Sequence, residues 1–182
     1  MLVWRVQLLS RNQANKSIRS MRMDFNLAYE SRCNATQLKK GLNMIKIRPV
    51  TEQDEKFWFS LDEYISREEF LLKVRDKRGY IIRVDNEPVG VMRYNLFWDN
   101  IPFLTMINID ESFQGRGIGR HAMLYWEDKM KKTGYNLVMT STQIDEEAQH
   151  FYRKLGYVDK GALFFDGTGL EQPQEVVMMK VL

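Results

Sequence analysis

The part of the chain best suited to chemistry is a glycine-rich stretch, residues 114–119, with the sequence QGRGIG. Glycine lets a backbone approach a ligand closely, and the first N–H groups of a helix have no partner inside the helix. The positive end of the helix dipole attracts anions, and Arg116 and Arg120 add full positive charges. The stretch therefore predicts a cradle for a pyrophosphate, and a purely structural turn is the alternative.

Three phosphate-binding patterns compete for this stretch. A nucleotide-binding P-loop ends in Gly-Lys-Ser/Thr, which is absent here. A dinucleotide fingerprint that starts at Gly115 needs a small residue at position 120, where this chain has Arg120. The pattern that fits is Gln/Arg-x-x-Gly-x-Gly/Ala, because Gln114, Gly117 and Gly119 fill its fixed places.

This pattern and its surroundings resemble the GNAT acyltransferase superfamily, which binds the pyrophosphate of acyl-CoA between its fourth strand and third helix. Predicted strands at 106–109 and 137–140 flank the loop and its helix. Residues 148–157, AQHFYRKLGY, are similar to the family signature of Ala, three residues, Tyr, two residues and Leu-Gly-Phe/Tyr. The resemblance covers 45–181. It implies an N-acetyltransferase that moves an acetyl group from acetyl-CoA, its cosubstrate, to an amine without a metal.

The resemblance also implies where the cofactor lies. The backbone around the fourth strand would hold the pantetheine arm, and the acetyl carbonyl would lie near Asn108 and Thr140. The family often has asparagine where this chain has Asp145, so a cofactor contact there stays open, and we also expect Asp145 to cap a helix. The residues expected at the cofactor are Ile107, Asn108, Ile109, Gln114, Gly115, Arg116, Gly117, Ile118, Gly119, Arg120 and Asp145.

Tyr152 corresponds to the family tyrosine that protonates the departing thiolate. A phenol with a pKa of about 10 can protonate a thiolate whose thiol has a pKa of about 8.5 only when its environment assists. A plain core aromatic is the alternative. Because the only cysteine, Cys33, lies outside the matching region, the resemblance favours direct attack in a ternary complex over an acyl-cysteine route.

The attacking amine must be neutral, so a base or a water chain has to remove its proton. The nearest candidates are Asp110 and Glu111, although such acids more often cap a loop. We expect His121 and His150 to face solvent.

The acceptor pocket of the family falls on residues 52–69, which hold seven acids against Lys56 and Arg67. Such a segment would attract a cationic amine, and a solvated helix face is the alternative. The aromatic residues expected beside it are Phe57, Trp58 and Tyr64, and Trp98 and the loop at 166–169 would shape the pocket or cover the sheet.

The elements that must position these residues follow from apolar periodicity and turn signals. The predicted fold is α/β, a mixed and mostly antiparallel twisted sheet flanked by helices. The expected strands are 45–50, 79–84, 89–97, 103–109, 137–140, 157–165 and 176–181. The expected helices are 52–61, 66–77, 117–133 and one that opens at Asp145.

Composition limits the class of protein. The chain has 182 residues, of which 44% are hydrophobic, which suits a single α/β domain. One cysteine excludes a disulfide framework and a thiolate metal cluster, so a reducing cytoplasm is expected. No apolar run approaches the roughly 20 residues that cross a bilayer, so we expect a soluble protein and no membrane partner.

Charge divides the chain at Met44. Residues 1–43 carry a net charge of +6, which leaves −3 for the remainder. A mildly acidic body is a poor platform for nucleic acid. Lys39-Lys40-Gly41 would be written in purine-rich codons just before Met44, which resembles a bacterial ribosome-binding site translated in frame. We therefore expect the functional protein, a GNAT domain spanning 44–182, to start at Met44. The alternatives for 1–43 are a targeting leader and a basic arm that binds RNA or a membrane.

The expected function is acetylation of a small-molecule or peptide amine. The first alternative is a CoA-binding regulatory module without catalysis, and the second is an RNA-associated factor that depends on residues 1–43. A homodimer is left open. The amine, the acyl-chain preference and the base are not specified by the sequence.

Overall fold

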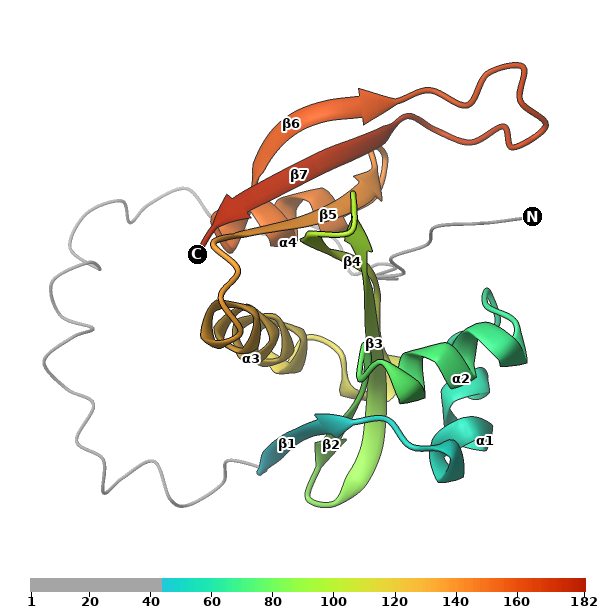
Figure 1. Ribbon diagram of the computed structural model, residues 1–182, viewed down its shortest axis with the longest axis vertical. Coiled ribbons are helices and arrows are strands. Elements are labelled where there is room, and N and C mark those ends of the chain that lie inside the picture. The colour runs from blue at the N-terminus through green and yellow to red at the C-terminus, as the bar shows by residue number, and fades with distance from the viewer. Residues whose placement is uncertain (1–43) are drawn as a thin grey trace, which may run out of the picture.

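A seven-stranded sheet forms the centre of the computed structural model, which describes residues 44–182 (Figure 1). Residues 1–43, with Cys33 and the predicted boundary, lie outside the described residues. The spatial order is β1-β2-β3-β4-β5-β7-β6, and every neighbouring pair is antiparallel except β4 and β5. The strands are β1 (Ile45–Pro49), β2 (Gly79–Val84), β3 (Glu87–Phe97), β4 (Ile101–Ile109), β5 (Leu137–Gln143), β6 (Val158–Leu163) and β7 (Glu175–Val181). The predicted fold class is confirmed.

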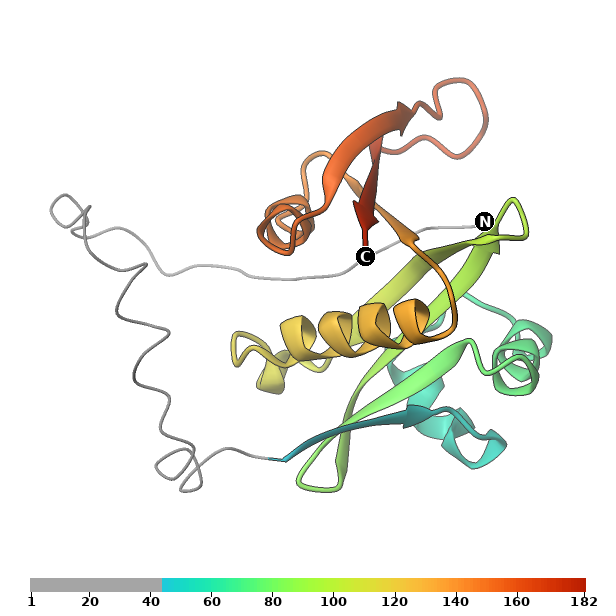
Figure 2. The ribbon, with the colours of Figure 1, turned by 60° about the vertical axis from the view of Figure 1, so that its left-hand side comes forward.

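Helices cover both faces of the sheet, with α1 and α2 on one face and α3 and α4 on the other (Figures 1 and 2). The helices are η1 (Glu52–Asp54), α1 (Glu55–Leu61), α2 (Arg67–Arg75), η2 (Glu111–Phe113), α3 (Ile118–Lys132) and α4 (Ala148–Lys154). The described residues contain no helix with both the length and the apolar composition needed to span a membrane.

Two apolar cores lie on the two faces. The larger core joins the sheet to α3 and α4 through side chains such as Leu104, Ile118, Trp126 and Tyr152. The smaller core lies under α1 and α2 and contains Trp58, which is fully buried. Trp58, which was expected beside the acidic segment 52–69, therefore belongs to the core, where its side chain packs against Phe70 with ring centroids 5.5 Å apart.

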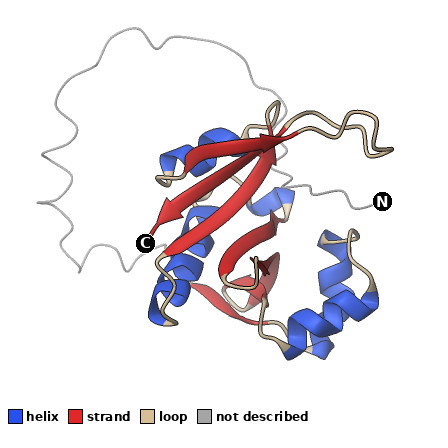
Figure 3. Cartoon of the chain, turned by 45° about the horizontal axis from the view of Figure 1, so that its top comes forward, coloured by secondary structure: helices blue, strands red, loops and turns tan. Residues whose placement is uncertain are grey.

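The sheet opens between β4 and β5. These parallel strands pair only at Phe103 with Met139 and at Leu104 with Thr140. Immediately afterwards the β3–β4 register shifts, so that Thr105 is an extra residue on β4. A bulge of this kind bends its strand. The end of β4 therefore leaves β5, and the three C-terminal strands lie broadside in Figure 3 while the other strands are seen obliquely.

Candidate functional site

The glycine-rich stretch forms a loop that its own side chains brace. Gln114 donates its side-chain amide to the carbonyl oxygen of Ile109 at 2.7 Å. Arg116 donates to the carbonyl oxygen of Ser112 at 2.7 Å, and its guanidinium lies over the Phe113 ring, 5.2 Å from the centroid. The side chains of Gln114 and Arg116 thus hold the loop in place, which leaves the backbone to face a ligand.

Two glycines give the loop its backbone conformation. Gly115 has a φ of 72° and Gly117 a φ of 78°, in the left-handed region that side chains disfavour. Gly117 is the N-cap of α3, no side chain caps this helix end, and no acid lies in its first turn. The first N–H groups of α3 are therefore available to an anion, as the sequence predicted.

A cavity of about 420 Å³, here called the glycine-loop cavity, lies beside these N–H groups. Its lining includes Arg120 from α3 and Lys154 from α4, and none of its lining residues is acidic. Sequence reasoning missed Lys154 and its neighbour Phe151. Their spacing puts Lys154 and Phe151 on one helical face with Leu155, and this could have suggested a shared role. Nothing in the sequence, however, placed α4 opposite the glycine-rich loop. The predicted residues that line this cavity are Ile109, Gln114, Gly115, Gly117, Ile118, Gly119 and Arg120, whereas Arg116 does not.

The end of β4 separates this cavity from a second one. Ile107 and Ile109 belong to the core on the α3 side, whereas Asn108 donates its side-chain amide to the carbonyl oxygen of Leu61, at the end of α1. Alternation along a strand explains why these neighbours point to opposite faces. The Asn108 side chain therefore lies on the opposite face of β4 from the glycine-loop cavity.

The second cavity, here called the acidic cavity, has two adjoining compartments of about 500 and 180 Å³ that share Leu61 and Asn108. Its charged lining residues are Glu63, Asp110 and Glu111, and none is a cation. It also shares Ile109 and Gln114 with the glycine-loop cavity, so the two meet at the end of β4. Tyr64, which the sequence analysis expected beside the acceptor pocket, lines the smaller compartment.

Asp110 has a structural task in this cavity. Its carboxylate accepts the backbone N–H and the hydroxyl of Ser112 and so caps η2. These hydrogen bonds lower the pKa of Asp110. A carboxylate that is stabilised in this way is a weak proton acceptor, which makes Asp110 a poor candidate for a base.

The acids of residues 52–69 do not act as one charged surface. Only Glu63 among them lines the acidic cavity, while others are neutralised locally. The ion pairs are Asp54 with Arg48, Glu55 with Arg67, Asp62 with Arg93, and Glu69 with Lys73. Neither the attractive surface nor the wholly solvated face that the sequence suggested describes this segment.

Asp62 is the clearest departure, because it is fully buried. Its Oδ2 lies 2.6 Å from Nε of Arg93, and Arg93 also donates to the hydroxyl of Thr105 at 2.9 Å. This network ties the end of α1 to the bulge of β4. It therefore holds the acidic cavity against the point where the sheet opens.

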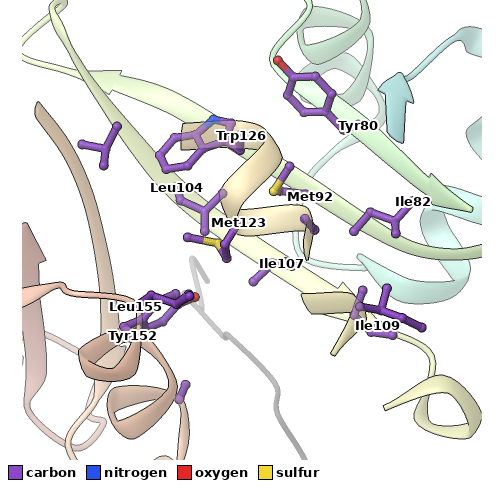
Figure 4. Close-up of a cluster of buried hydrophobic side chains, with 14 of the residues drawn as sticks. Tyr80, Ile82, Met92, Leu104, Ile107, Ile109, Met123, Trp126, Tyr152 and Leu155 are labelled. Atoms are coloured by element: carbon purple, nitrogen blue, oxygen red, sulfur yellow. The ribbon is translucent and has the colours of Figure 1, made fainter. Parts of the chain in front are cut away.

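Tyr152 lies on α4 in the larger core, across from Ile107 and Ile109 (Figure 4). Its hydroxyl is fully buried and makes no hydrogen bond of good geometry, although Thr140 is near enough to act on its pKa. Burial raises the pKa of Tyr152, so the phenol stays protonated. Thr140 itself donates to the carbonyl oxygen of Leu104 at 3.2 Å, at the last β4–β5 pair.

The start of α4 differs from the sequence prediction. The helix begins at Ala148 with Glu147 as N-cap, and Asp145 is exposed in the preceding turn. The predicted cap at Asp145 is therefore wrong. The reason is that residues 143–146 form a turn, in which the backbone N–H of Glu146 donates to the carbonyl oxygen of Gln143, and the helix starts only after this turn. His121 and His150 are exposed, as predicted.

Comparison with known proteins places the chain in a family. The model of the acetyltransferase (GNAT) family matches residues 44–157, more than half of the chain. Comparison with curated proteins gives no significant match. Within residues 44–182, no group of three or more His, Cys, Asp or Glu side chains is placed to hold a metal ion.

Solved structures show the same fold at low identity. Ard1 from Thermoplasma volcanium is 18% identical, with a TM-score of 0.67 over 76% of this chain and 97% of that chain. Arabidopsis thaliana Naa50, in complex with the bisubstrate analogue CoA-Ac-MVNAL, is 13% identical, with a TM-score of 0.64 over 76% and 99%. A GNAT family acetyltransferase from Elizabethkingia anophelis with acetyl-CoA bound is 19% identical, with a TM-score of 0.61 over 76% and 98%.

Proposed function

Since the chain belongs to the acetyltransferase (GNAT) family, we propose that it transfers an acetyl group from acetyl-CoA to a primary amine of a small molecule or peptide. The observation that carries the proposal is the pair of cavities of opposite charge that meet at the end of β4. An anionic cofactor suits the glycine-loop cavity, and a cationic amine suits the acidic cavity.

Three features support acetyl-CoA as the donor. The uncapped start of α3 and the nearby Arg120 and Lys154 suit its phosphates. Among residues 44–182, no strand pairs with β4 on the β5 side past Leu104, so this backbone is free to bind the amides of the pantetheine arm. The buried hydroxyl of Tyr152 has no partner and lies where β4 and β5 part, which suits a polar atom of the cofactor.

When bound, acetyl-CoA supplies a thioester that an amine can attack directly. The opening between β4 and β5 holds the two reactants together, and orientation of this kind supplies much of the rate. Tyr152 then gives its proton to the departing sulfur. Although burial raises the pKa of the phenol, the same dry surroundings raise the pKa of the thiol, so proton transfer remains feasible.

The first test is binding and turnover of the full chain. We expect calorimetry to show binding of acetyl-CoA, and CoA release with at least one amine of a panel. The panel contains the peptide Met-Val-Asn-Ala-Leu, whose sequence occurs in the Naa50 analogue, and small cationic amines. Binding without CoA release from any amine would favour the regulatory module instead.

The second test is Tyr152→Phe, which keeps the ring and removes the proton. We expect kcat to fall about 100-fold, with the KM for acetyl-CoA nearly unchanged. The matched control is Tyr157→Phe, because Tyr157 also buries a hydroxyl without a partner, but next to Glu127. An unchanged kcat in Tyr152→Phe would exclude the proton-donor role, and equal losses in both variants would point to a general packing effect.

A further inference from the structure

A buried carboxyl group lies beside the opening of the sheet and has no role in the chemistry described so far. Glu175, the first residue of β7, is only 2% exposed. Its carboxylate accepts a long hydrogen bond of 3.5 Å from Gln172, and Ser141 is near enough to stabilise its charge. In the described part of the chain it has no cationic partner. Such burial is costly and calls for an explanation.

Pairing places Glu175 at the edge of the opening. Glu175 lies opposite Gln143 on β5, and Ser141 is the first residue of β5 after the last pair with β4. Along β7, Val176 and Met178 belong to the core under α3 and α4. Because side chains alternate along a strand, Glu175 points to the other face of the sheet, the face on which Asn108 and the acidic cavity lie, and it is not itself a lining residue of that cavity. The connection from β6 to β7 also extends on that side (Figure 1).

Tyr152 lies on the opposite face of β5. It belongs to the core with Val176 and Met178, and it is near enough to Glu175 for the carboxylate to act on the pKa of the phenol. The two groups thus flank β5, Tyr152 on the side of the glycine-loop cavity and Glu175 on the side of the acidic cavity. A thioester and an amine that meet in the opening would arrive from these same two sides.

We propose that Glu175 is the base that accepts the proton of the attacking amine. The inference rests on the proposed function. An amine that arrives as ammonium first loses one proton to solvent. The nitrogen lone pair then forms the C–N bond while Glu175 takes the remaining excess proton. The C–S bond breaks, and the sulfur takes the phenolic proton of Tyr152. The proton on Glu175 returns to Tyr152 through solvent, which restores both groups.

The acidity of Glu175 suits this task. Burial raises its pKa to about 7, the charge of Glu146 acts in the same direction, and the hydrogen bond with Ser141 opposes both. The charged or titratable groups that act on it are Glu146, in the turn before α4, and Tyr152 on α4. An ordinary carboxylate, with a pKa of about 4.3, is a much weaker acceptor for the proton of an amine with a pKa of about 10.4.

The decisive variant is Glu175→Gln, which keeps the shape and removes the base. With the fastest amine of the panel, we expect kcat to fall about 100-fold and the affinity for acetyl-CoA to stay unchanged. We expect the pH profile of kcat/KM in the native protein to have an acidic limb near pH 7, and this limb should disappear in the variant. The matched control is Glu171→Gln, an exposed acid of the same connection, which should keep both the rate and the limb. A native kcat and limb in Glu175→Gln would overturn the inference.

A second variant tests the environment of Glu175. Glu146→Gln removes a neighbouring negative charge, so the acidic limb should move to lower pH. A limb that stays in place in Glu146→Gln and in Glu175→Gln belongs to another group and would overturn the inference.

A third measurement needs no acceptor. Carboxyl ¹³C NMR of the full chain, with the Glu175 signal assigned by its loss in Glu175→Gln, should give a pKa near 7, and an ordinary value would overturn the inference.

Because the folded-state pKa of Glu175 is raised, the free energy of unfolding should fall as pH rises from about 4.5 through 7, and Glu175→Gln should lose this dependence on pH. If the native protein fails to bind acetyl-CoA, the proposed function is wrong. If Glu175→Gln binds acetyl-CoA normally and keeps the native rate, only the assignment of Glu175 as the base is wrong.

Discussion

The two cavities at the end of β4 differ in sign and in construction. The glycine-loop cavity has the cations Arg120 and Lys154, whereas the acidic cavity has Glu63, Asp110 and Glu111. The two share only the end of β4 and Gln114. Under the proposed function, the end of β4 separates a cavity suited to phosphates from a cavity suited to an ammonium group, and each reactant would be drawn to its own side.

Their construction differs as well. The glycine-loop cavity uses main-chain N–H groups whose direction is fixed by Gly115 and Gly117, both at positive φ. The acidic cavity uses side chains from α1, the α1–α2 connection and η2, held by the buried pair of Asp62 and Arg93. A site made of main chain tolerates few side-chain types, whereas a site made of side chains can change its ligand by substitution. The cofactor is therefore easier to infer than the amine.

Filling the glycine-loop cavity should abolish the difference between the two cavities. In Gly119→Leu the new side chain starts in helical backbone, and its Cβ lies 3.7 Å from the Phe151 ring, so the fold should be kept. The rest of the side chain enters the cavity, and we expect the affinity for acetyl-CoA to fall at least about 100-fold by calorimetry. Gly119→Ala is the control and should bind far better. Native affinity in Gly119→Leu would show that the cofactor lies elsewhere.

A smaller effect is expected from reversing the charge of this cavity. Lys154→Glu replaces an attraction for phosphate by a repulsion, and we expect a loss of about 10-fold in affinity for acetyl-CoA, which shrinks in high salt. Lys131→Glu, at the exposed far end of α3, makes the same change of net charge and should have little effect. Equal losses in the two variants would mean that overall charge, not the cavity, attracts the cofactor.

Local patterns in the sequence predicted the glycine-rich loop and the helix that follows it well. The glycine at its start and the lysines in its last turn indicated the ends of α3. This helix was expected at 117–133 and spans Ile118–Lys132, with Gly117 as its N-cap. The same glycines marked the loop. Such features depend on residues close together in the chain, so a sequence contains them directly.

Contacts between distant segments were not predictable in this way. Lys154 lines the cavity beside the glycine loop because α4 and α3 border the same cavity, and the buried Asp62 is paired with Arg93 on β3, 31 residues later. Glu175 looked like part of a polar loop, since the predicted strand began at 176. Its burial arises from pairing with β5 and β6, which no local pattern reveals.

Removal of one carboxylate from the acidic cavity should have only a small effect. In Glu63→Gln or Glu111→Gln one carboxylate near the amine is lost, and we expect the KM for a cationic acceptor to rise about 3-fold, with kcat and acetyl-CoA affinity unchanged. Exposed charges are screened, so the rise should vanish in high salt. Glu68→Gln, an exposed acid at the start of α2, is the control. If all three variants raise KM equally, the acceptor is attracted by the net charge of the protein and not by the acidic cavity. The proposal that charge sends the two reactants to opposite sides of β4 would then be wrong.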